Sequence, residues 1–92
     1  MTKTKDVQDV LKLALNGKIS DSRNKMIELI KVYGMSESDF LKYITQAVFS
    51  SKTKNLEETL EIIAKYDYRV LVGANPEIQL SALLAEFAKI GK

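Results

Sequence analysis

The chain contains no cysteine, no histidine and only one proline among its 92 residues. Without thiol and imidazole side chains it cannot form disulfides, supply a thiol nucleophile or an imidazole base, or build the zinc sites that these residues form. We therefore expect no catalytic residue, no metal site and no bound cofactor in this chain. The single proline, Pro76, follows Asn75 and marks the start of a helix, because its missing N–H costs nothing there.

The chain also lacks a large excess of charge of either sign. Its net charge is +2, and twelve of the fourteen basic residues are lysine rather than arginine, the residue that bidentate recognition of phosphates and bases prefers. Electrostatics alone therefore do not indicate a dedicated nucleic-acid reader. No signal peptide opens the chain, and no apolar run approaches the roughly 18 residues that cross a bilayer. We expect a soluble intracellular protein with no membrane partner.

Apolar residues at helical spacing are what the sequence has in abundance. They make up 46% of the chain, and strand-type alternation is absent. The length supports one modest core, so residues 1–92 are predicted to form a single all-α domain, a compact bundle of about five helices. Gly17, Gly34 and Gly73 follow three of the helical segments, as is typical of helix ends. The predicted helices cover approximately residues 5–16, 20–33, 37–51, 56–72 and 76–90.

The last predicted helix is apolar around most of its circumference. A helix of this kind is buried on most sides, and four others of this size can hardly cover it completely. The uncovered part is expected to form an exposed apolar patch, a common mark of an interface. Burial as the central helix of the bundle is the alternative interpretation. The candidate interface anchors on this helix are Leu80, Leu84, Phe87 and Ile90.

The stretch Asp67–Leu80, which reads DYRVLVGANPEIQL, resembles the C-terminal domain of the small subunit of replication factor C, the archaeal and eukaryotic sliding-clamp loader. In that family a helix ending in aspartate-x-arginine and a Gly-Ala turn precedes a helix with Ile-Gln-Leu and paired leucines, here Leu83 and Leu84. The segments Val10–Gly17 and Tyr33–Ser36 are also similar to the family. The resemblance thus covers nearly the whole chain.

The resemblance implies a five-helix collar domain that packs side by side with other clamp-loader subunits. In the family such domains hold AAA+ ATPase modules, with their ATP and magnesium, in a ring that loads the sliding clamp onto primed DNA. This sequence has no G-x-x-x-x-G-K-[ST] loop, so we expect a non-enzymatic collar domain cut from a longer protein or expressed alone. The implied location is the cytoplasm or nucleoid of an archaeon, or a eukaryotic nucleus.

Two charged residues near the end of the fourth predicted helix are further interface candidates. Asp67 falls on the predicted apolar stripe of that helix, where a carboxylate needs donors or a shifted pKa. A structural anchor, paired with a neighbour's Arg69 or with backbone amides, is favoured over a catalytic acid, because no histidine, cysteine or second carboxylate lies one turn away. Arg69 is expected to cap its own helix or to form an ion pair with a neighbour.

A helical DNA-binding module is the main alternative function. It would use Lys3, Lys5, Lys52 and Lys54 to contact phosphates, although scattered lysines usually only solvate a surface. A small helical enzyme or metal carrier is the least favoured hypothesis, since histidine and cysteine are missing.

Overall fold

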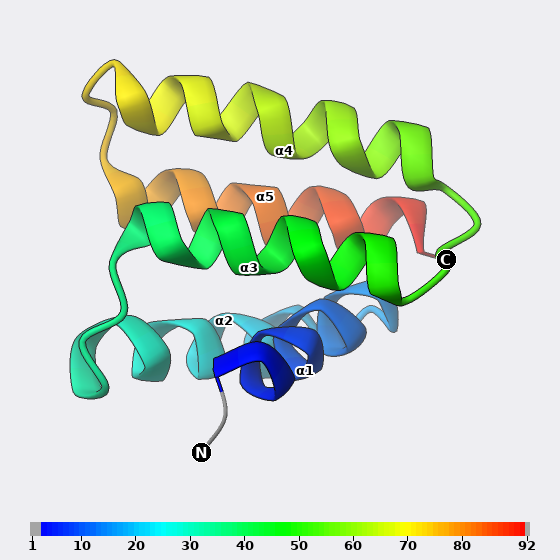
Figure 1. Cartoon of the computed structure of the whole chain (residues 1–92), viewed down its shortest axis with the longest axis horizontal. Helices are drawn as coiled ribbons and strands as arrows, with labels where there is room; N and C mark the ends of the chain where they lie inside the picture. The colour runs from blue at the N-terminus through cyan, green and yellow to red at the C-terminus, as the bar shows by residue number, and fades with distance from the viewer. Residues whose placement is uncertain (1–2, 92) are drawn as a thin grey trace.

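A computed structural model describes residues 3–91, and the predicted all-α bundle of five helices is confirmed (Figure 1). No helix in this part of the chain is both long and apolar enough to cross a membrane. The helices are α1 (Lys3–Leu15), α2 (Ile19–Ile27), which continues into the π-helical turn η1 (Glu28–Val32), α3 (Glu37–Ser50), α4 (Leu56–Leu71) and α5 (Pro76–Ile90).

Side chains at the helix starts explain where two of the helices begin. The Ser36 hydroxyl accepts the N–H of Asp39 at 3.0 Å at the start of α3. At the start of α5 the Asn75 side chain accepts the N–H of Ile78 at 3.0 Å, and Pro76 is the first helical residue. Each contact satisfies one of the N–H groups that a helix start leaves free.

The second predicted helix, residues 20–33, is not a regular α-helix to its end. From Glu28 the backbone widens into η1, where the N–H of Tyr33 donates to the carbonyl of Glu28 at 3.2 Å. The widened turn places Leu29 in the core and leaves Val32 and Tyr33 exposed.

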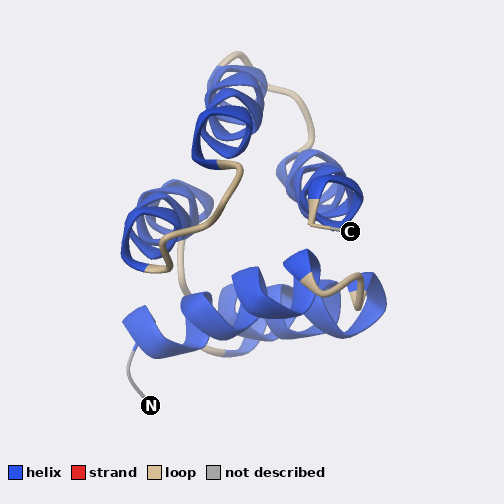
Figure 2. Cartoon of the chain, turned by 90° about the vertical axis from the view of Figure 1, so that its right-hand side faces the viewer, coloured by secondary structure: helices blue, strands red, loops and turns tan. Residues whose placement is uncertain are grey.

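The helices form two groups. α1 and α2 lie together below, and α3, α4 and α5 stand above them with α4 farthest away (Figure 2). α5 packs against α1, α2 and α4, whereas α1 also packs against α3, and α4 packs against α3 and α5. The core fills the space between the two groups and draws its largest fully buried side chains from all of the helices except α4.

The expectation that part of the last helix lies open as an apolar patch was wrong for its central residues. Leu80, Leu84 and Phe87 have no exposed surface, and Ile90 is partly buried against the same core. The physical reason is that α5 has neighbours on three sides, so the alternative interpretation of a central helix describes it. Only Ile78, near its start, is a large apolar side chain of α5 that faces solvent.

This arrangement predicts that truncating two side chains of similar size in α5 lowers the stability of the protein by very different amounts. Leu84→Ala is expected to lower the free energy of unfolding by about 3 kcal/mol, because it leaves a cavity at a fully buried position. Ile78→Ala, a matched change at an exposed position, is expected to change it by less than about 0.5 kcal/mol. Urea denaturation followed by circular dichroism measures both values, and equal effects would contradict the central position of α5.

Candidate subunit interface

The outward face of α4 carries apolar side chains that no helix covers. The inward face, which packs on α3 and α5, buries Thr59, Ile62, Ile63 and Tyr66. On the opposite side Tyr68, Leu71 and the following residue Val72 are 65%, 80% and 60% exposed. Tyr68 lies three and four residues before the other two, a spacing that makes side chains neighbours on a helix surface.

The start of α5 carries one more exposed apolar side chain. Ile78 is 64% exposed, and the end of α4 and the start of α5 lie at the same side of the bundle, on the left of Figure 1. We call Tyr68, Leu71, Val72 and Ile78 the α4–α5 patch. Single exposed apolar residues are normal, but a group of four around one turn is the kind of surface that marks an interaction site.

Gly73 fixes the backbone beneath the α4–α5 patch. Its φ is +98°, a conformation that other residues adopt only with strain. The turn is closed by the N–H of Gly73, which donates to Val70 at 3.2 Å, and that of Ala74, which donates to Arg69 at 3.0 Å. The patch is therefore held on a defined turn.

A cluster of polar side chains joins α4 to α5 by a hydrogen bond and an ion pair. The hydroxyl of the buried Tyr66 donates to Glu86 at 2.5 Å, and the ammonium of Lys65 lies 2.7 Å from the same carboxylate. Burial, with Glu86 as hydrogen-bond acceptor and negative neighbour, raises the pKa of Tyr66. Burial alone raises the pKa of Glu86, but the hydrogen bonds from Lys65 and Tyr66 outweigh it and hold that pKa below the ordinary 4.5. The cluster therefore favours an ionised Glu86 and a neutral Tyr66.

A second polar cluster holds the start of α5 against α2 and η1. The guanidinium of Arg23 donates to Glu77 at 3.1 Å and to the hydroxyl of Ser81 at 3.0 Å. Lys31 lies 3.3 Å from the other carboxylate oxygen of Glu77. These contacts leave Ile78, the next residue, directed to solvent.

The two charged interface candidates of α4 lie beside the α4–α5 patch. The expectation that Asp67 occupies the apolar stripe was wrong, because it is exposed and lies about 100° around the helix from the buried Tyr66. Arg69 is also exposed, and its guanidinium lies 5.2 Å from the centre of the Tyr66 ring. Within residues 3–91 neither Asp67 nor Arg69 belongs to an ion pair, so their expected pairing with a neighbour stays a prediction.

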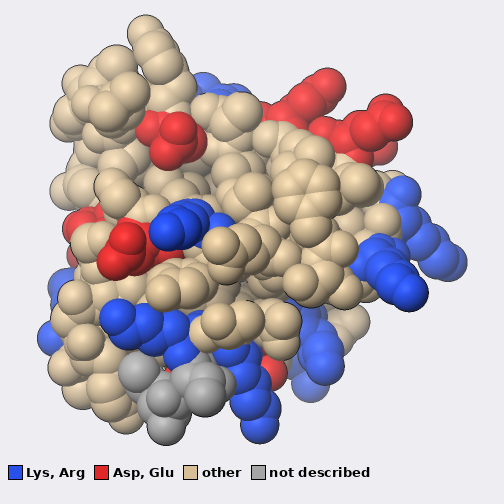
Figure 3. Space-filling model, in the orientation of Figure 1, with Lys and Arg blue, Asp and Glu red and all other residues tan. Residues whose placement is uncertain are grey.

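The four lysines of the DNA-binding alternative fall into two separate pairs. Lys3 and Lys5 lie in the first turn of α1, and Lys52 and Lys54 lie in the α3–α4 turn. All four are exposed. Figure 3 shows basic side chains spread over the lower half and right edge of this face, so they do not form one compact patch there.

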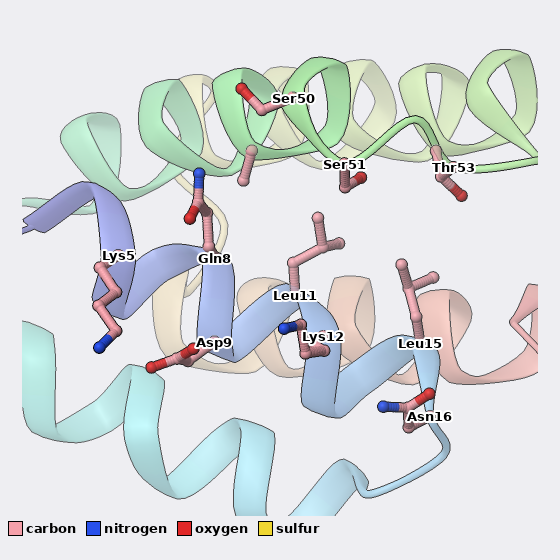
Figure 4. A pocket seen from close by; sticks show the side chains of 11 residues that line it. Lys5, Gln8, Asp9, Leu11, Lys12, Leu15, Asn16, Ser50, Ser51 and Thr53 are labelled. Carbon is pink, nitrogen blue, oxygen red and sulfur yellow. The ribbon is translucent and has the colours of Figure 1, made fainter.

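A groove lies between α1 and the end of α3, on another side of the molecule from the α4–α5 patch. It has a volume of about 520 Å³, and the apolar residues that line it are Leu11, Leu15 and Ala47, of which Leu11 and Ala47 are almost fully buried. The remaining lining residues are polar or charged: Lys5, Gln8, Asp9, Lys12, Asn16, Ser50, Ser51 and Thr53. Figure 4 shows Leu11 and Leu15 pointing from α1 toward Ser51 and Thr53. We call this feature the α1–α3 groove.

Comparison with known proteins decides the family. The family described as the replication factor C C-terminal domain matches residues 2–86. The chain belongs to this family. It is 41% identical to the replication factor C small subunit of Methanocella arvoryzae, over 97% of this chain and 28% of the relative, and 38% identical to that of Saccharolobus solfataricus, over 99% and 29%. The chain therefore spans less than a third of the length of these curated relatives, and the resemblance drawn from the sequence is confirmed.

Within this replication factor C domain, the expected apolar patch on the last helix is buried except for Ile78, and the other exposed apolar side chains lie at the end of α4. None of Tyr68, Leu71, Val72 and Ile78 is among the interface candidates expected from the sequence. A signal was present, because Ala64, Tyr68, Leu71 and Val72 follow the i, i+4, i+7, i+8 pattern of a second apolar stripe. Two stripes on one helix indicate that both faces meet apolar surroundings.

The Tyr66–Glu86 cluster predicts a dependence of stability on pH. A carboxylate whose pKa is lowered on folding stabilises the fold above its ordinary value of 4.5, and this contribution disappears as the pH falls through the lower folded value. Glu86→Gln is expected to reduce the free energy of unfolding at pH 7 by about 1 kcal/mol and to have little effect near pH 3. Urea denaturation at both pH values measures this, and an equal loss at both would show that charge on Glu86 is unimportant.

Proposed function

We propose that this chain is the collar domain of a clamp-loader small subunit and that it joins neighbouring subunits through the α4–α5 patch. The observation that carries the proposal is the group of four exposed apolar side chains on a turn held by polar clusters. A surface of this kind loses unfavourable contact with water when a partner covers it. The family membership supports a role in a replication factor C assembly.

The proposal divides the work of the longer protein between its parts. The helical domain supplies contacts between subunits, whereas ATP and magnesium are handled by AAA+ modules outside this chain. The sliding clamp and primed DNA are reached through the full-length protein, inside the cell. The chain itself catalyses no reaction in this scheme.

The α4–α5 patch is preferred to DNA binding through lysines as the main function. Covering apolar area yields a favourable free energy whether or not salt is present, whereas two separated lysine pairs give a weak, salt-dependent attraction. In the proposed assembly those lysines serve solubility or contacts between subunits.

Multi-angle light scattering tests the proposal on the chain alone and mixed with the longer replication factor C subunits of the same cell. At concentrations of about 10 µM to 1 mM we expect either a mass above the 10.4 kDa monomer for the chain alone, or a complex in the mixture that is heavier than the longer subunits measured without the chain. The double variant Tyr68→Ser with Leu71→Asp is expected to weaken the association about tenfold or more, because it removes exposed apolar area and places a charge in the contact.

The matched control is Phe49→Ser, which removes another exposed aromatic ring, on α3 and outside the patch. It is expected to leave the association unchanged. A wild-type chain that stays monomeric both alone and in the mixtures would refute the proposed function.

A further inference from the structure

The outward face of α4 is acidic in its N-terminal half and apolar in its C-terminal half. Glu57 and Glu61 lie at its N-terminal half, on the same side of the helix as Tyr68 and Leu71 at its C-terminal half. Figure 3 shows acidic side chains projecting at the upper right, over the start of α4, and an almost uncharged upper left corner, over its end. Neither glutamate belongs to an ion pair within residues 3–91.

The α1–α3 groove has the opposite charge pattern. Among its lining residues are the partly buried Leu15, beside the buried Leu11, and the exposed lysines Lys5 and Lys12. The one carboxylate that lines it, Asp9, lies 3.9 Å from the ammonium of Lys25 and is partly compensated. In the described part of the chain no ion pair includes Lys5 or Lys12, so both are available to an acidic partner.

The two surfaces also lie on different sides of the bundle. α4 is the outermost helix of the upper group, and α1 belongs to the lower group (Figure 2). A protein that presents complementary surfaces on different sides associates head to tail, because each copy offers one surface and receives the other. A ring requires contacts of this heterologous kind.

We propose that the outward face of α4 in one copy of this chain docks into the α1–α3 groove of a second copy. Glu57 and Glu61 face Lys5 and Lys12, and Tyr68 and Leu71 cover Leu15 and the aliphatic parts of the side chains around it. The groove volume of about 520 Å³ suits the insertion of a few large side chains. This inference rests on the proposed function and adds the partner surface and the direction of the contact.

Charge reversal on each surface, alone and together, tests the docking. The α4 variant carries Glu57→Lys and Glu61→Lys, and the groove variant carries Lys5→Glu and Lys12→Glu. Each is expected to weaken self-association of the chain about tenfold in sedimentation velocity, because like charges then face one another. The chain with all four substitutions restores opposite charges and the original net charge, so its association is expected to return to within about threefold of wild type.

A matched control separates the contact from a general effect of charge. Asp21→Lys with Glu28→Lys changes the net charge as much as the α4 variant does, at exposed positions of α2 and η1. It is expected to leave association unchanged, and circular dichroism of every variant verifies that the helices are formed. A control that weakens association as much as the α4 variant would overturn the docking.

The outcomes distinguish this inference from the proposed function. If the groove variant associates like wild type, or the four substitutions together restore nothing, the α1–α3 groove is not the partner surface. The same holds if the wild-type chain associates only with longer subunits and never with itself. In each case loss of association in the Tyr68 and Leu71 double variant would still support the α4–α5 patch as an interface.

Discussion

The burial of α5 at the centre of the bundle is the constraint on which the rest of the structure depends. Leu80, Leu83, Leu84 and Phe87 are fully buried, and each such side chain contributes about 1.5–3 kcal/mol through removal from water. A helix that is apolar on most sides needs neighbours on most sides. α1, α2 and α4 provide these neighbours. The inner face of α4 packs against α5 and α3, and its outer face remains exposed to solvent.

Hydrophobic burial has no direction, so it does not by itself fix how the helices are rotated against one another. A few hydrogen bonds between helices supply that information. The Ser22 hydroxyl donates to the carbonyl of Val10 at 2.8 Å between α2 and α1, and the Asn55 amide donates to the carbonyl of Ile90 at 2.8 Å between the start of α4 and the end of α5. Together with the clusters around Glu86 and Glu77, they determine which side chains of α4 and α5 face solvent.

Features set by local chemistry were predictable from the sequence. The Asn75–Pro76 pair marks the start of α5, and Gly73 adopts the positive φ expected after a helix. Features set by contacts between helices were not. The sequence pattern assigns Asp67 to the buried face because α4 has apolar residues on two sides. Two orientations of this helix about its own axis would therefore each bury an apolar stripe. The buried Thr59, whose hydroxyl donates to the carbonyl of Asn55 at 2.6 Å, shows which rotation occurs.

The same ambiguity explains why the interface residues could not be selected from the sequence. An apolar helix is equally consistent with the centre of one bundle and with a contact between two bundles. Only the packing shows that α5 occupies the first position, and this leaves α4 as the helix with apolar residues on both faces. Its inner stripe is used within the fold, and Tyr68 and Leu71 on its outer stripe make few contacts there. A surface of this kind adds nothing to the stability of a single copy, so its composition is best explained by a partner.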